Sequence, residues 1–306
     1  MFKGLRFRGP AAPLIAVYGV LWALSTAYLF AKGADWTFPL VSLAIFGLAL
    51  SGLAALLTRR AQPPAVPVAR PGLELGAVLA FLGIYAVVFL GWGLGAARAA
   101  VPAGPAQELA VLALKLVVHV GLPSLLLLVL GASLKPLFDP GVGRRGFWPT
   151  LIVLGVVLFG LLSVVSPSLK QIAATHASAA TLAWAAPATF VWYALEAGLC
   201  EEFLFRAVLQ SRLAAVLKSS AGAVVIGAVL FSLAHVPGIY LRGNPEVDGY
   251  STDVLQVAAF AIATLSPIAL LFGTVWARTR SLLLLVLLHS AVDTLPNMAE
   301  FIRTWG

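Results

Sequence analysis

Residues 148–165 read WPTLIVLGVVLFGLLSVV, a run in which no side chain carries a charge. The hydrocarbon core of a bilayer is about 30 Å thick, and an α-helix needs roughly 20 apolar residues to cross it. Runs of similar length and character recur along the chain, bounded by charges, prolines or glycines. The sequence therefore predicts nine membrane spans, at approximately residues 12–31, 37–57, 74–97, 107–131, 148–165, 185–212, 221–241, 254–277 and 281–301.

The composition excludes an ordinary soluble protein. Of the 306 residues, 61% are apolar and 10% are charged, whereas soluble domains carry about 25% charged residues. Such a chain has too little polar surface to cover an exterior that faces water. We therefore expect an all-α, polytopic bundle of transmembrane helices. The single cysteine, Cys200, excludes an intrachain disulfide and a CxxC metal site.

The basic residues indicate topology rather than nucleic-acid binding. The formal charge is +8, but the lysines and arginines stand in short clusters between apolar runs. With the N-terminus in the cytoplasm, 13 of these 20 residues fall in segments predicted to lie inside and 5 in segments predicted to lie outside, as the positive-inside rule requires. The inside set begins with Lys3, Arg6 and Arg8, ahead of the first span. The sequence thus predicts an integral membrane protein surrounded by lipid, with no nucleic-acid partner.

Ionisable side chains gather in three late spans. Each such side chain costs about 2.5–3.5 kcal/mol inside a membrane helix and by default marks a functional site. These side chains are Glu196, Glu201, Glu202 and Arg206 in span 185–212, His235 in span 221–241, and His289 and Asp293 in span 281–301. Four earlier spans are almost free of interior charge and are predicted to form a lipid-facing jacket: 12–31, 37–57, 74–97 and 148–165.

Glu202 and Arg206 are four residues apart and therefore share a helix face. We expect the guanidinium to neutralise Glu202, because two adjacent carboxylates cannot both ionise cheaply in a medium of low dielectric constant. Glu201 points about 100° further round the helix. It remains as the free carboxylate, which is what a general base requires.

The same spacing recurs on the two spans that carry histidine. Phe231 precedes His235 by four residues, and Asp293 follows His289 by four, so each imidazole has a neighbour on its own helix face. Counted along the spans, both histidines reach about the depth of Glu201. Carboxylate and imidazole groups around one cavity could activate a water and stabilise an oxyanion, as amide hydrolysis requires. The same groups could bind zinc, and the spacing does not separate these alternatives.

These residues carry a resemblance to a known family. Three segments are similar, in order and approximate separation, to the EExxxR, FxxxH and HxxxN/D motifs of the CPBP family of type II CAAX prenyl endopeptidases and bacteriocin-processing enzymes. The segments are Glu201–Arg206 (EEFLFR), Phe231–His235 (FSLAH) and His289–Asp293 (HSAVD). The resemblance covers roughly residues 184–296. It implies a CPBP-like catalytic core in residues 184–306, preceded by transmembrane helices in residues 1–183.

The resemblance also implies roles for the motif residues. Glu201 and His235 would activate the water, and His289 and Asp293 would form the oxyanion site. Supporting roles would fall to Glu202, Arg206 and Phe231. Asp293 stands where asparagine is commoner in the family, so it is expected either to be protonated or to act by orienting His289. No cofactor is required; a divalent metal such as zinc, held by Glu201, His235 and His289, is the alternative.

The expected function is that of an intramembrane endopeptidase, glutamic-type or metal-assisted, in the bacterial inner membrane. Its substrate would be a membrane-anchored protein or peptide, cut near a membrane-embedded, lipid-modified or C-terminal sorting-tail segment. Two other classes of function stay open. One is a non-proteolytic immunity or scaffold protein, and the other is a proton-coupled transporter that uses the same groups as a relay. The transporter is disfavoured because the sequence lacks two matching Gly/Pro-broken segments in separate halves.

Three further positions have two interpretations each. Cys200 could be a nucleophile beside a histidine, although a buried cysteine is more often inert. Lys115 and His119 could line an access groove, although a snorkelling lysine and a packed histidine are favoured. Glu196 lies within two turns of Glu201 and could support it.

Overall fold

The computed structural model describes residues 11–306, a part of the chain that is helical and contains no β-strand. Lys3, Arg6 and Arg8 lie outside the described residues, so their cytoplasmic placement stays a prediction. Eight helical runs are long and apolar enough to cross a membrane. These runs confirm the all-α, polytopic class and coincide with eight of the nine predicted spans.

Several of the eight runs contain a short π-helical stretch, denoted η. The first four are α1 (Ala11–Ala31); α2 (Thr37–Ser42), η1 (Leu43–Leu50) and α3 (Ser51–Leu57); α4 (Pro71–Ile84), η2 (Tyr85–Gly93) and α5 (Leu94–Ala100); and α6 (Pro105–Leu116), η3 (Val117–Gly121) and α7 (Leu122–Val129). The other four are α8 (Phe147–Val165); α12 (Ser220–Leu233) and α13 (Val236–Arg242); α14 (Val254–Phe260), η7 (Ala261–Leu265) and α15 (Ser266–Thr279); and α16 (Leu282–Trp305). Two short helices stand between them, the 3₁₀ turn η4 (Lys135–Leu137) and α9 (Ser168–Ala173).

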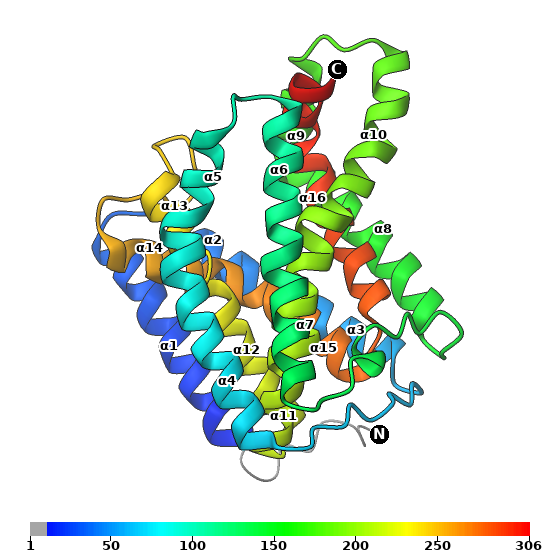
Figure 1. Ribbon diagram of the computed structural model, residues 1–306. Helices are drawn as coiled ribbons and strands as arrows, with labels where there is room; N and C mark the ends of the chain where they lie inside the picture. The colour runs from blue at the N-terminus through cyan, green and yellow to red at the C-terminus, as the bar shows by residue number, and fades with distance from the viewer. Residues whose placement is uncertain (1–10) are drawn as a thin grey trace.

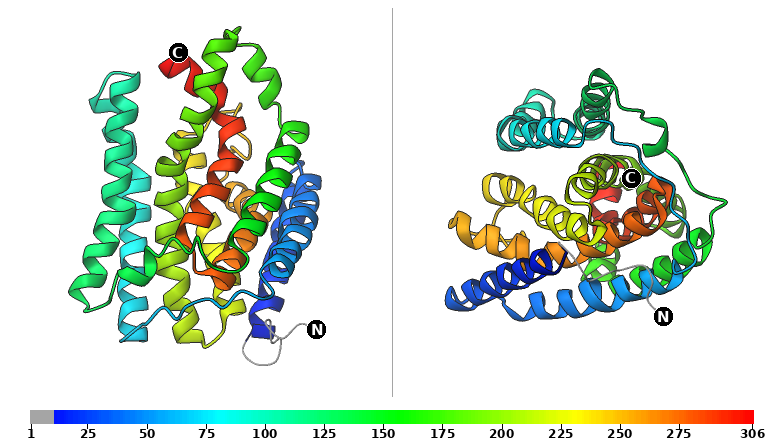
Figure 2. Two further views of the ribbon diagram at one scale, coloured as in Figure 1. Left: turned by 90° about the vertical axis from the view of Figure 1, so that its right-hand side faces the viewer. Right: turned by 90° about the horizontal axis from the view of Figure 1, so that it is seen from below.

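The ninth predicted span, 185–212, lies inside a further helical run that is more polar than the eight. This run consists of α10 (Ala179–Tyr193), η5 (Ala194–Leu199), Cys200 and Glu201, η6 (Glu202–Gln210) and α11 (Ser211–Leu217). It lies in the middle of the bundle, with α4 to α7 on one side and α12, α15 and α16 on the other (Figures 1 and 2). The charged residues of the chain's most polar span are therefore enclosed by other helices.

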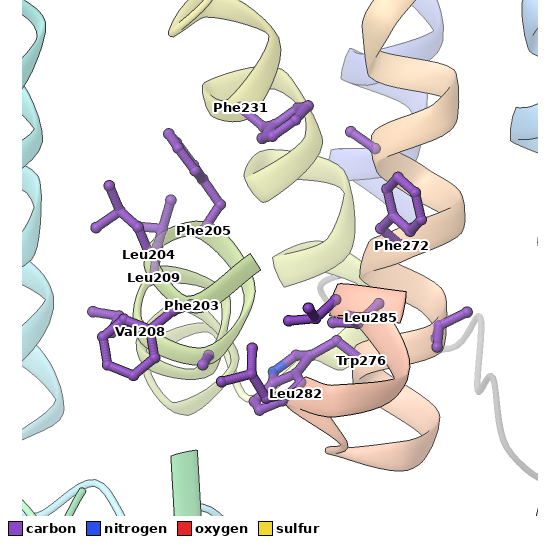
Figure 3. Close-up of a cluster of buried hydrophobic side chains, with 14 of the residues drawn as sticks. Phe203, Leu204, Phe205, Val208, Leu209, Phe231, Phe272, Trp276, Leu282 and Leu285 are labelled. Atoms are coloured by element: carbon purple, nitrogen blue, oxygen red, sulfur yellow. The ribbon is translucent and has the colours of Figure 1, made fainter. Parts of the chain in front are cut away.

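The central run is held by packing of large apolar side chains. Phe203 and Leu209 of η6 are fully buried, as is Trp276 of α15, and they belong to one cluster with side chains from α12 and α16 (Figure 3). Lipid tails are as apolar as these side chains, so close van der Waals packing rather than escape from water stabilises the contact. The cluster fixes η6 against α15 and α16.

Gly198 in η5 allows α16 to approach the central run closely. A Cβ at this position would lie 2.9 Å from the backbone oxygen of Val286, so a larger residue would push the helices apart. Small residues at crossings serve this purpose in membrane bundles. The two acidic motif residues follow Gly198 by about one turn, and His289 follows Val286 by about one turn. The close crossing therefore brings these groups together.

Span 74–97, predicted to be part of the lipid-facing jacket, carries one charged side chain that faces the interior of the bundle. Glu74 of α4 is fully buried, and its Oε2 lies 3.2 Å from Nε of the equally buried Arg212 in α11. Each charge neutralises the other, so removal of either partner would leave a buried charge uncompensated. The helix α4 is therefore fastened to the central run by a buried ion pair.

Candidate active site

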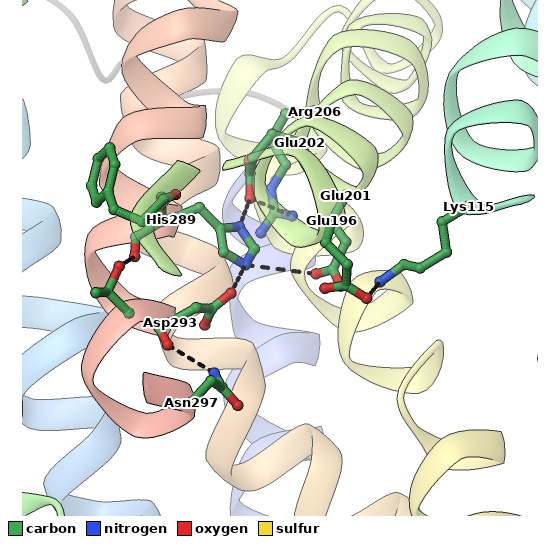
Figure 4. A network of polar contacts seen from close by, with 11 residues as sticks. Lys115, Glu196, Glu201, Glu202, Arg206, His289, Asp293 and Asn297 are labelled. Atoms are coloured by element: carbon green, nitrogen blue, oxygen red, sulfur yellow. Dashed lines mark hydrogen bonds and ion pairs between the residues drawn. The ribbon is translucent and has the colours of Figure 1, made fainter. Parts of the chain in front are cut away.

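One imidazole stands at the centre of the polar cluster. The Nδ1 of His289 in α16 lies 2.7 Å from Oε1 of Glu202 in η6, and the same oxygen lies 3.2 Å from Nη1 of Arg206. The predicted Glu202–Arg206 pair is thus confirmed as a contact. It is not an isolated pair, because Glu202 also binds the histidine (Figure 4).

The other ring nitrogen of His289 faces two further carboxylates. Its Nε2 lies 3.3 Å from Oδ2 of Asp293 and 3.8 Å from Oε2 of Glu201. The ring of Phe272 stacks on the imidazole with an interplanar angle of 2°, which fixes the plane of the ring. Glu201, expected to be the free carboxylate, therefore sits at ion-pair distance from His289 and not apart from it.

Arg206 is enclosed by aromatic rings as well as by Glu202. Its guanidinium carbon lies 4.0 Å from the centre of the Phe231 ring, a cation–π distance. Phe231 in turn contacts the His235 ring, with 4.8 Å between centres. A chain of contacts thus joins the first motif to the second and confirms that Phe231 and His235 are neighbours.

A cavity of about 280 Å³ opens beside Glu201 and is shared with His235. His235 stands at the break between α12 and α13, and its Nδ1 lies 3.0 Å from the carbonyl oxygen of Phe231. A carbonyl only accepts, so Nδ1–H donates and Nε2 of a neutral ring keeps its lone pair. Among the described residues that line this cavity, His289 and Asp293 do not appear, and His289 reaches it only through its contact with Glu201.

Lys115 and Glu196 form an ion pair that the sequence did not predict. Nζ of Lys115 lies 2.5 Å from Oε1 of Glu196, so the favoured interpretation of a snorkelling lysine was wrong. Lys115 also lines the cavity. Glu196 therefore neutralises a lysine beside the cavity.

His119 is packed, as favoured, but it also lines the cavity. Its Nε2 lies 2.9 Å from the hydroxyl of Tyr85, and its Nδ1 lies 2.9 Å from the carbonyl oxygen of Lys115. Tyr85 and Arg242 line the same cavity. The sequence analysis did not select either residue, because neither stands three or four residues from another candidate. Tyr85 could have been noticed only as a hydroxyl group within an otherwise apolar span.

Cys200 lies next to Glu201 in the chain but is fully buried, and within residues 11–306 it is not among the residues that line the cavity. One observation bears on metal binding. Across the described part of the chain, no group of three or more His, Cys, Asp or Glu side chains has an arrangement that could hold a metal ion. The choice between the glutamic and the metal-assisted type stays a prediction.

Comparison with known proteins gives one family match, over the part of the chain that carries the three motifs. Residues 183–295 match the family model described as type II CAAX prenyl endopeptidase Rce1-like. No curated protein and no solved structure matches the chain. The matched segment contains all three motifs, and together with the helical bundle it defines a CAAX-type intramembrane endopeptidase in an integral membrane protein. This match lies in the carboxy-terminal part of the chain, which is similar to the Rce1-like family.

Proposed function

We propose that the protein hydrolyses a peptide bond with a water activated by Glu201 and His235. The observation that carries the proposal is the position of Glu201, which lines a cavity with His235 and lies 3.8 Å from Nε2 of His289. A base and a second acceptor thus line one cavity, and the proposed oxyanion donor contacts the base. The family match supports a protease, and the glutamic type is our inference from this arrangement.

In the proposed reaction, a water in the cavity gives one proton to the Glu201 carboxylate, while its second hydrogen stays on the oxygen and donates a hydrogen bond to Nε2 of His235. The water oxygen forms a bond to the carbonyl carbon of the substrate, and the carbonyl oxygen takes the negative charge. Glu201 then returns the proton to the amine nitrogen as the C–N bond breaks. One new carboxyl group and one new amino group result.

His289 would stabilise the negative oxygen through its Nε2–H. Glu202 accepts from Nδ1 of the ring at 2.7 Å, which holds the ring and directs Nε2 toward Glu201. Asp293 contacts Nε2 at 3.3 Å from the same helix. We infer that Asp293 acts by orienting His289, the second of its two expected roles, and that Arg206 keeps Glu202 ionised.

The proposed substrate is a membrane-anchored or lipid-modified protein or peptide, including one with a C-terminal sorting tail. The candidate residues lie within helices long enough to cross a bilayer or in the run these helices enclose. A segment that enters the cavity must therefore lie at membrane depth. We further propose the bacterial inner membrane, a cytoplasmic N-terminus and a division into a jacket (1–183) and a catalytic core (184–306).

Membrane proteomics tests this function and identifies the substrate in the same experiment. Cells whose only copy is Glu201→Gln, His235→Ala or His289→Ala should accumulate the same uncut precursors. Glu300→Gln is the matched control, because Glu300 is exposed on α16. If all four variants give the wild-type proteome, the scaffold or transporter alternative would replace the protease.

A further inference from the structure

Tyr85 and His119 form a buried pair that lines the cavity, on helices that carry none of the three motifs. Tyr85 begins η2 and His119 lies in η3, and their side chains are 6% and 1% exposed. Both lie outside the matched residues 183–295, and neither has a part in the proposed reaction. Helices outside the matched domain thus contribute polar groups to the cavity that Glu201 lines.

The hydrogen bonds of the pair determine which of its atoms remain free. Nδ1 of His119 lies 2.9 Å from the carbonyl oxygen of Lys115, and a carbonyl only accepts, so the proton of a neutral ring is on Nδ1. Burial beside the rings of Tyr85 and Phe89, whose centres are 5.1 and 5.5 Å away, favours the uncharged ring. Nε2 is then an acceptor, and the hydroxyl of Tyr85 donates to it at 2.9 Å. The phenol oxygen keeps its lone pairs for a donor in the cavity.

A substrate segment in this cavity has donors to satisfy. A membrane-embedded peptide must leave its helical conformation before its carbonyl can be attacked, and each freed backbone N–H costs several kcal/mol if it finds no acceptor at membrane depth. The carboxylate of Glu201 is committed to the water, and that of Glu196 to Lys115. The phenol oxygen of Tyr85 is a neutral acceptor in the same cavity.

We propose that Tyr85 and His119 form a subsite for an extended stretch of the substrate peptide. The phenol oxygen of Tyr85 accepts a hydrogen bond from one backbone N–H near the cut bond, and His119 positions Tyr85 by holding its hydroxyl proton. Phe89, Leu90 and Leu94 line the cavity beside the pair and receive an apolar side chain. This subsite rests on the proposed function and extends it to the recognition of substrate backbone.

The test removes the proposed donor hydrogen from the peptide by N-methylation and the proposed acceptor oxygen from the protein by Tyr85→Phe. The probes are a peptide spanning a cut site found in the proteome comparison, and copies of it N-methylated at single backbone amides near that site. Binding is measured to the Glu201→Gln protein, which holds the peptide uncut, with and without Tyr85→Phe. We expect N-methylation at one position and Tyr85→Phe each to weaken binding by about 10-fold. In combination they should give no further loss.

Tyr18→Phe is the matched control. Tyr18 is a 7% exposed tyrosine of α1 whose hydroxyl lies 2.9 Å from Oγ of Ser266, and it should leave binding unchanged. His119→Phe keeps an aromatic ring but removes the acceptor, so it should reduce the penalty of N-methylation. The subsite would be overturned if N-methylation weakened binding as much with Tyr85→Phe as without it. It would also be overturned if Tyr18→Phe weakened binding as much as Tyr85→Phe does. Because binding needs no turnover, that result is distinct from failure of the proposed hydrolysis, which shows as wild-type protein that leaves the peptide uncut.

Discussion

Nδ1 of His289 and Oε1 of Glu202 lie 2.7 Å apart, although the two residues are 87 positions apart in the chain. The same oxygen lies 3.2 Å from Arg206, and the Glu202 side chain is fully buried. One carboxylate therefore holds both the histidine of the last motif and the arginine of the first. We propose that this carboxylate positions the two groups, whereas Glu201 lines the cavity.

Glu202→Gln is expected to destabilise the protein. The substitution leaves the buried guanidinium of Arg206 without a charge partner, and breaking a buried pair in this way costs about 3–5 kcal/mol. Unfolding of the detergent-purified variant, compared with wild type and with Glu300→Gln, measures the effect. A Glu202→Gln protein as stable as Glu300→Gln would show that Arg206 does not depend on this carboxylate.

The pair formed by Glu74 and Arg212 makes a separate prediction about stability. Both side chains are fully buried, 3.2 Å apart, so Arg212→Met leaves an unpaired carboxylate and should cost about 3–5 kcal/mol. The double variant Glu74→Gln/Arg212→Met removes both charges and should regain most of the loss. Thermal unfolding of the three proteins checks this order. Equal stability of the single and double variants would contradict it.

Cys200 is expected to be dispensable. Its side chain is fully buried, and a thiol in an apolar interior forms little of the nucleophilic thiolate. Cys200→Ala should cut the precursors at the wild-type rate, and thiol alkylation should leave the wild-type protein active. Loss of turnover in both experiments, with folding intact, would favour covalent catalysis by the thiol.

The helix order predicts opposite sides for the two ends of the described chain. The helix α1 begins at one end of the bundle and α16 finishes at the other (Figure 1), as nine crossings require. A reporter enzyme that works only outside the cytoplasm should be active when it is fused after Gly306 or near Arg98. A reporter that works only in the cytoplasm should be active when it is fused at Ser219, between α11 and α12. A cytoplasmic Gly306 would mean that one run does not cross.

The predicted spans and the contacts within a helix follow from the sequence because they depend on local periodicity. Residues four apart share a face, so the contacts of Arg206 with Glu202 and of Asp293 with His289 could be predicted from spacing alone. The roles assigned to these residues remain predictions.

The contacts between helices could not be predicted in this way. Whether Lys115 meets Glu196, or Tyr85 meets His119, depends on which faces pack together and in what register. Close approach at Gly198 sets that register for α16. Span 74–97 resembles a lipid-facing helix in sequence, because the side chains that pair with its Glu74 and Tyr85, Arg212 and His119, lie on other helices.

The most direct test compares purified wild-type protein with Glu201→Gln on one precursor found uncut in cells. Glu201 has a side chain 20% exposed and lies 3.8 Å from His289, so the amide should keep the fold while it removes the base. The wild-type and Glu300→Gln proteins are expected to cut the precursor at equal rates. Glu201→Gln is expected to unfold at the wild-type temperature and to leave the precursor intact. Full cleavage by folded Glu201→Gln would contradict water activation by this carboxylate.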